Sequence, residues 1–208
     1  MLIREMLLPE FETEMQSTRK ILAVLPEKLS DYKPHPKSMP LNNLAGHIAQ
    51  LPGWAKTTVE TEELDIDMSK WTPFRPASRQ EVLDEFDKAV KDARIALSSA
   101  SDEELAKTWT FKMQGQTIFA SPRSRVLRET VFNHLFHHRA QLGVYLRLLD
   151  IAIPGMYGPS ADEMHQQHED DRQAAHPVQG HHVSARDDGA LRARARRHDD
   201  ARASITSP

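Results

Sequence analysis

Apolar side chains recur at alternating spacings of three and four residues in long stretches of this chain. The first stretch runs from about Leu2 or Pro9 to Val24. Its stripe comprises Leu8, Phe11, Met15, Thr18, Leu22 and Leu25. This spacing places the side chains on one face of an α-helix, and a helix of this kind must pack that face against other elements.

Start and stop signals place a second and a third helix. A second helix is predicted at about residues 39–59, after a possible cap at Ser38, and Pro52-Gly53 should kink it. The sequence SRQE at residues 78–81 is a capping box, which opens a third helix that reaches about Leu97.

The fourth helix begins with Ser121 as cap and Pro122 in the first helical position, and it continues to about Asp150. Four amphipathic helices predict an all-α protein built as a four-helix bundle. Residues 61–77 are expected to form a long loop between the second and third helices. Residues 108–119 indicate a small hairpin.

The composition changes near residue 164. Residues 165–208 contain no Phe, Trp, Tyr or Lys, so they cannot bury enough apolar surface to offset the entropy lost on ordering. We therefore predict a folded domain at residues 1–164 and a disordered, low-complexity tail at 165–208. The tail's bias toward His, Asp, Arg and Ala also suggests a shifted reading frame, which an in-frame stop shortly after Glu163 on a one-base correction of the DNA would support.

Charge and cysteine content narrow the function classes. The net charge of −3 argues against general nucleic-acid binding. The chain has no cysteine, which excludes disulfides, zinc–thiolate sites and a cysteine nucleophile. No apolar run approaches about 18 residues, and the acidic N-terminal segment lacks the apolar core of a signal peptide. We therefore expect a cytoplasmic protein that does not bind membranes.

Three histidines within five positions mark the fourth helix. At about 100° per residue, His134 and His138 lie about 40° apart in the middle of the apolar stripe, whereas His137 lies at its border. Two imidazoles four residues apart on one face can reach one metal ion. The alternative is that they form hydrogen bonds to neighbouring helices, because a buried imidazole needs a partner.

His47 supplies a possible third ligand. It lies at the edge of the buried face that Leu44, Ile48 and Leu51 define on the second helix. A lone histidine there is often an ordinary boundary residue, but it is the only other core-facing histidine expected in residues 1–164. Three neutral imidazoles suit zinc, nickel or iron, and they leave positions open to water or substrate, as in catalytic sites.

Four further side chains near these histidines have expected roles. Gln141 is expected to line the site, and Trp54 either lines the pocket mouth or packs in the core. Arg139, about 140° from His134, is expected to form an ion pair at the surface or a dimer contact. Glu129 faces away from the histidines, which leaves no obvious carboxylate base beside the ligands in sequence.

Five segments occur in a characteristic order: LPEFETEMQSTRKILAVLPE, DYKPHPKSMP, LAGHIAQLPGW, NHLFHHRAQLGVYLRLL and IPGMYGPSADE. Together they resemble the DinB-like (DinB/YfiT-type) family of bacterial metalloproteins over about residues 5–163. The resemblance implies a four-helix bundle, a homodimer and a divalent metal bound by His47, His134 and His138. It also implies kinship with thiol-dependent transferases and isomerases, in which the metal activates a small thiol. The tail departs from the family pattern.

The leading prediction is a metal-dependent enzyme that acts on a small-molecule substrate. Its nucleophile is either hydroxide, for hydrolysis, or the thiolate of a low-molecular-weight cofactor, for transfer. Two alternatives stay open, namely a non-catalytic metal-binding stress-response protein and a helical dimerisation module whose histidines are hydrogen-bonded.

Overall fold

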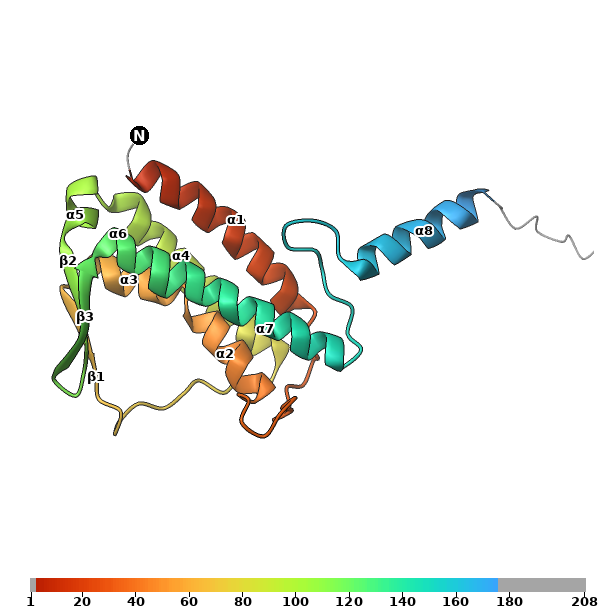
Figure 1. The fold of residues 1–208 in the computed structure, drawn as a ribbon, viewed down its shortest axis with the longest axis horizontal. Helices are drawn as coiled ribbons and strands as arrows, with labels where there is room; N and C mark the ends of the chain where they lie inside the picture. Colours follow the sequence, from red (N-terminus) through yellow and green to blue (C-terminus); the bar gives the residue numbers. More distant parts are fainter. Residues whose placement is uncertain (1–2, 176–208) are drawn as a thin grey trace, which may run out of the picture. The chain divides into compact units, whose positions relative to one another are not determined.

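Most of the chain's secondary structure is helical, and a small sheet accompanies the helices (Figure 1). A computed structural model describes residues 3–175 of the 208. The elements are α1 (Ile3–Ala23), α2 (Leu41–Gln50), α3 (Gly53–Glu60), β1 (Glu63–Ile66), α4 (Arg79–Ser99), α5 (Asp102–Ala106), β2 (Thr108–Met113), β3 (Gln116–Pro122), α6 (Arg123–Val126), the π-helical segment η1 (Leu127–Asn133), α7 (His134–Leu148) and α8 (Ala161–Ala175). The sheet means that the all-α prediction is wrong in its strict form.

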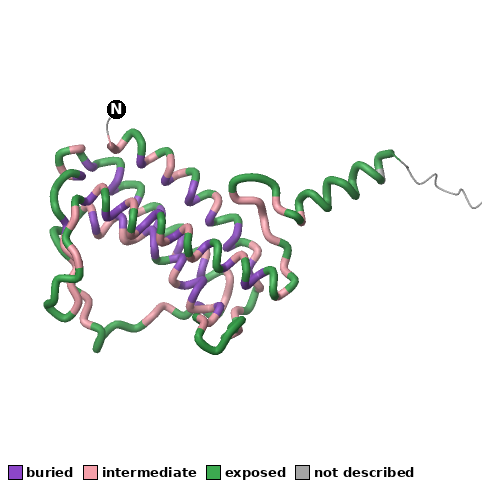
Figure 2. The backbone as a smooth tube through the Cα atoms, viewed as in Figure 1, coloured by how far each residue is buried: buried purple, intermediate pink, exposed green. Residues whose placement is uncertain are grey.

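The core lies where α1, α2, α3, α4 and α7 face one another. α4 contacts α1, α2 and α3, and α7 contacts α1 and α2. The buried stretches of these helices lie on their facing sides (Figure 2). Phe11 of α1 and Phe132 of η1 meet edge to face, with ring centroids 6.2 Å apart. The aromatic contact joins the buried faces of α1 and η1.

Side-chain caps set the starts of α4 and α5. The Ser78 hydroxyl accepts a hydrogen bond from the backbone N–H of Glu81. The Glu81 carboxylate in turn accepts one from the N–H of Ala77 at 3.0 Å. Ser101 caps α5 in the same way through Glu104. The predicted cap at Ser78 is therefore confirmed, whereas the Glu81 carboxylate bonds to the N–H one residue before the cap and not to that of Ser78.

The second and fourth predicted helices are each divided. Pro52 separates α2 from α3 and lies at the N-cap of α3. The fourth stretch consists of α6, η1 and α7, and its first helical residue is Arg123. Pro122 takes the N-cap position, where no side-chain hydrogen bond caps the helix. The predicted cap at Ser121 is therefore wrong, since Ser121 belongs to β3. In η1 the backbone bonds from i to i+5, which widens the turn just before His134.

The sheet has the order β1-β2-β3. β2 and β3 form the predicted hairpin, with Gln114 and Gly115 at positive φ in the turn. β1 pairs with β2 in parallel, in register from Glu63 with Thr110 to Ile66 with Met113. Residues 63–66 were expected to be part of a loop, and that expectation is wrong.

The chain divides into two units at His165 and Gln166. α8 crosses this boundary and continues to Ala175, so residues 165–175 of the predicted tail are helical. Residues 176–208, which make up the greater part of the predicted disordered tail, lie outside the described residues. Between residues 3 and 175, no helix is long and apolar enough to cross a membrane.

Candidate metal centre

Three histidines from two helices meet with their ring nitrogens facing one another. His47 comes from α2, whereas His134 and His138 are one turn apart on α7. Nε2 of His134 lies 3.2 Å from Nε2 of His47 and 2.9 Å from Nε2 of His138. One nitrogen from each ring lies within 4.8 Å of the other two. The structure thus brings together the three residues that the sequence proposed as metal ligands.

The spacing of these nitrogens suits one metal ion. Two nitrogens that are each about 2.0–2.1 Å from an ion lie about 2.9 Å apart at a right angle and about 3.4 Å apart at the tetrahedral angle. The measured separations of 2.9 Å and 3.2 Å fall within this range. Imidazole nitrogen is also a suitable donor for zinc, nickel and iron.

A hydrogen bond on the far side of the His138 ring fixes which of its nitrogens carries the proton. Nδ1 of His138 lies 2.8 Å from Oε1 of Gln141. Since a carbonyl oxygen only accepts, Nδ1 donates and Nε2 keeps its lone pair. The ring of His134 likewise hydrogen-bonds to the backbone of Thr130 in η1. When both Nε2 atoms keep their lone pairs, these atoms, 2.9 Å apart, cannot hydrogen-bond to each other, and a cation between them satisfies both.

Burial favours the neutral form of all three rings. Burial, followed by the charges of His138 and His134, lowers the pKa of His47 to about 4. Burial also lowers the pKa of His134 and of His138, against the opposing hydrogen bonds to Thr130 and Gln141. The neutral imidazole is the form that binds metals, so the three ligands are ready at pH 7.

A cavity of about 250 Å³ lies beside His47. Its other lining residues lie just before α2, on α2 and in the segment between β1 and α4: Met39, Asn43, Gln50, Trp71, Pro73 and Phe74. Gly46 lets that segment approach α2. A Cβ at residue 46 would lie 2.5 Å from the backbone oxygen of Phe74 and 2.8 Å from Cδ of Pro76. The glycine before His47 therefore shapes one wall of the cavity.

We expect Gly46→Ala to lower the free energy of unfolding by about 1–3 kcal/mol, because the added methyl group forces the segment off α2. Gly53→Ala is the matched control in the next helix. Its Cβ would meet only Cβ of Ala89, at an ordinary 3.9 Å, so stability should stay unchanged or rise by up to about 1 kcal/mol. Urea unfolding of both variants measures the difference. Equal stabilities would contradict the close approach at Gly46.

Gln141 and Trp54 lie in different surroundings. Gln141 contacts the ring of His138, as described above. Trp54 packs against Phe111 of β2, with ring centroids 5.7 Å apart. It lines a separate surface hollow between α3 and α4 and is not among the residues that line the cavity at His47.

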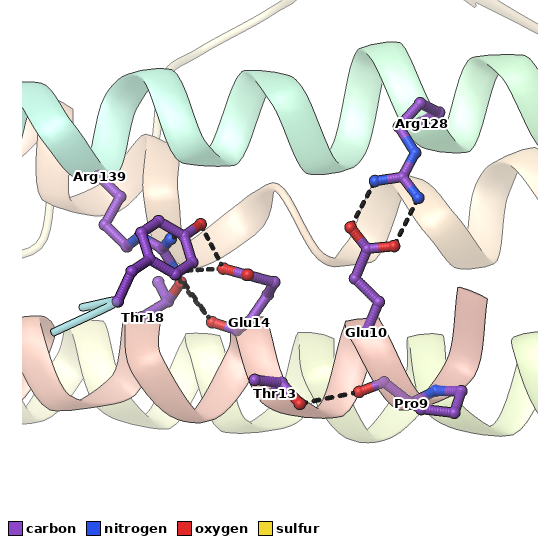
Figure 3. Close-up of polar contacts among 8 residues, drawn as sticks. Pro9, Glu10, Thr13, Glu14, Thr18, Arg128 and Arg139 are labelled. Carbon is purple, nitrogen blue, oxygen red and sulfur yellow. Dashed lines mark hydrogen bonds and ion pairs between the residues drawn. The ribbon is translucent and has the colours of Figure 1, made fainter. Parts of the chain in front are cut away.

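Arg139 is buried, so the expectation of a surface ion pair is wrong. Its side chain is 3% exposed, and Nη1 lies 2.8 Å from Oε2 of Glu14, whose side chain is 9% exposed. Nη1 also donates to Oγ1 of Thr18, and Nη2 donates to the hydroxyl of Tyr157. Figure 3 shows Arg139 reaching across to Glu14 and Thr18 on α1. This cluster, Glu14, Thr18, Arg139 and Tyr157, ties α7 to α1 one residue after His138.

The chain is similar to one protein family over most of its length. The sequence model of the DinB family matches residues 3–172. Among solved structures, a DinB-like protein from Bacillus cereus ATCC 10987 is 25% identical with a TM-score of 0.55, covering 72% of this chain and 95% of that one. A DinB-like protein (YjoA) from Bacillus subtilis is 16% identical with a TM-score of 0.54, covering 74% and 98%. Comparison with curated proteins gave no match.

Proposed function

Because the chain belongs to the DinB family, we propose that it is a metal-dependent enzyme in which His47, His134 and His138 bind one divalent ion, namely zinc, nickel or iron. The observation that carries this proposal is the convergence of three Nε2 atoms, with neighbouring separations of 2.9 Å and 3.2 Å. When bound, such an ion supplies Lewis acidity, which lowers the pKa of a water or thiol that approaches it.

The surroundings of the three histidines support a catalytic role over a structural one. Three protein ligands leave positions open, whereas structural sites are usually closed by four. Gln141 holds His138 in the tautomer that presents Nε2. The cavity beside His47 offers space for a small-molecule substrate. Since the chain has no cysteine, a reacting thiol would be a separate small molecule, and water is the other nucleophile.

The second candidate is a non-catalytic metal-binding protein. The lining of the cavity favours it, because His47 is the only acid or base among the lining residues, so proton transfer would depend on the substrate or the ion. The two candidates differ in turnover. Failure of the metal-loaded protein to transfer any of a panel of small thiols to electrophiles, or to hydrolyse esters and amides, would favour the binding protein.

We also propose that α1, α2 with α3, α4 and the α6–α7 stretch form a four-helix bundle, and that the protein is a homodimer. The contacts of α4 with α1, α2 and α3, and of α7 with α1 and α2, support the bundle. Val144 and Leu148, one turn apart on α7 and 58% and 56% exposed, offer apolar surface to a second copy. The mass of the protein in solution tests the dimer.

Metal analysis of the full-length protein tests the ligand set. We expect wild-type protein to bind about one more divalent ion per chain than the His138→Ala variant. The variant keeps every histidine outside the site, so any metal bound there is the same in both proteins. His137→Ala is the matched control, because His137 is the exposed neighbour of His138 and should keep the ion. Circular dichroism checks that each variant is folded. Equal metal content in wild type and His138→Ala would contradict the assignment of His138 as a metal ligand.

A further inference from the structure

The helical stretch that carries His134 and His138 changes its hydrogen-bond pattern just before the first of them. In η1 the backbone bonds run from i to i+5, whereas α6 before it and α7 after it are α-helical. A π-helical segment is rare, and segments of this kind inside α-helices are frequent at functional sites. The position of η1, ending at the residue before His134, therefore links it to the proposed metal site.

η1 changes the partner of one carbonyl group beside this site. In a regular α-helix the backbone N–H of His134 would donate to the carbonyl of Thr130, four residues back. Here that N–H donates to the carbonyl of Val131 instead. The ring of His134, in turn, hydrogen-bonds to the backbone of Thr130. A carbonyl that a regular helix would pair with the backbone is thus available to a side chain.

His134 is the histidine whose placement matters most for the site. Its Nε2 lies 3.2 Å from Nε2 of His47 and 2.9 Å from Nε2 of His138, so both separations depend on it. Because Nε2 faces these two rings, Nδ1 is the ring nitrogen that remains for Thr130. A hydrogen bond to the far nitrogen fixes the orientation and the tautomer of a metal-binding imidazole. His138 has such a bond to the side chain of Gln141.

We propose that η1 positions His134 for the metal, because it leaves the carbonyl of Thr130 free to accept a hydrogen bond from Nδ1–H of His134 and so directs Nε2 toward the ion. Thr130 is then a positioning residue that acts through His134 and uses its backbone, as Gln141 acts through His138 with its side chain. This inference rests on the proposed function, since it concerns the same ion.

Deletion of Glu129 tests this role, because it returns the segment to an α-helix. Leu127 and Phe132 are five residues apart, as the π pattern requires, and after the deletion they are four apart, as an α-helix requires. Thr130 stays four residues before His134, so the backbone N–H of His134 now competes with the ring for this carbonyl. Glu129→Ala is the matched control, since it removes the same side chain with its exposed ion pair but keeps the residue.

Titration of the full-length, metal-free proteins with Ni²⁺ measures the effect. We expect deletion of Glu129 to weaken Ni²⁺ binding about 10–100-fold, as loss of the hydrogen bond behind a metal-binding histidine usually does, whereas Glu129→Ala should bind like wild type. The visible absorption of the bound Ni²⁺, which depends on its coordination geometry, should change only in the deletion variant. Without metal, the melting temperatures of the two variants should differ by less than about 4 °C, because the helix itself is kept.

Two results of the titration would overturn the inference: wild-type affinity in the folded deletion variant, or an equal loss of affinity in Glu129→Ala. If the deletion variant does not fold, NMR of the zinc-loaded wild type replaces it. The Nδ1–H of His134 should then exchange slowly with water, because it is hydrogen-bonded, and rapid exchange would overturn the inference.

The same measurements separate this inference from the proposed function. Failure of the wild-type protein to bind Ni²⁺ or zinc would remove the proposed function. Equal and tight Ni²⁺ binding by the wild type and the folded deletion variant would leave the metal site intact and remove only the role of η1.

Discussion

Arg139→Met is expected to lower the free energy of unfolding by about 3–5 kcal/mol, the usual cost of breaking a buried ion pair. The substitution removes the guanidinium whose Nη1 lies 2.8 Å from Oε2 of Glu14. It leaves a carboxylate that is 9% exposed without an opposite charge. Thr18 and Tyr157 lose their hydrogen-bond donor at the same time. Denaturant unfolding of wild type and variant measures the loss.

Two further variants show whether burial sets this cost. Adding Glu14→Leu to Arg139→Met removes the stranded charge, so the double variant should be more stable than Arg139→Met alone. Arg128→Met is the matched control, because Arg128 pairs with Glu10 of α1 from the same helical stretch (Figure 3) but the two side chains are 39% and 33% exposed. Its cost should stay below about 1 kcal/mol. Equal costs for the two arginines would show that burial is not decisive.

The helical wheel identified the inward-facing histidines but misplaced the buried face around them. His134 and His138 are half-buried and face His47. The buried residues of α7, however, are Leu135, Arg139, Leu142, Tyr145 and Leu146, so the histidines lie at the edge of this face. An apolar stripe extended at about 100° per residue from residues 127–133 into α7 assumes a regular α-helix throughout. That segment is π-helical, with a wider turn, so its face and that of α7 are offset.

Arg139 shows what periodicity leaves open. The wheel correctly turned it away from the histidines, but periodicity says only which side a residue takes and not what packs there. On that side α1 presents Glu14 and Thr18 in place of solvent. Glu14 adjoins the apolar stripe of α1 in sequence, and this was the only available sign that a carboxylate would be buried.

β1 and the cavity wall depend on contacts between distant parts of the chain. Residues 63–66 become a strand because β2 supplies a parallel partner, and so short a segment carries little strand signal of its own. Similarly, Asn43 and Phe74 line one cavity only because the backbone of residue 74 approaches Gly46. The sequence shows Gly46, but it does not indicate which distant segment packs against that glycine.

Chelation of the bound metal is expected to lower the melting temperature by about 8–16 °C when the free ion was previously present at a thousand times its Kd. Binding to the folded chain at this concentration contributes about 4 kcal/mol, and about 1 kcal/mol shifts the melting temperature by about 2–4 °C in a domain of this size. Thermal unfolding followed by circular dichroism, with and without chelator, measures the shift.

The stability measurement separates the three-histidine site from the other histidines of the chain. An ion stabilises the folded state only when the folded chain binds it more tightly than the unfolded chain. His47 reaches the other two rings only through the packing of α2 against α7, so unfolding destroys this site. Histidines that bind the ion equally well in the folded and the unfolded chain contribute nothing to the melting temperature. His138→Ala should therefore melt at the same temperature with and without chelator, and a shift as large as that of wild type would place the ion elsewhere.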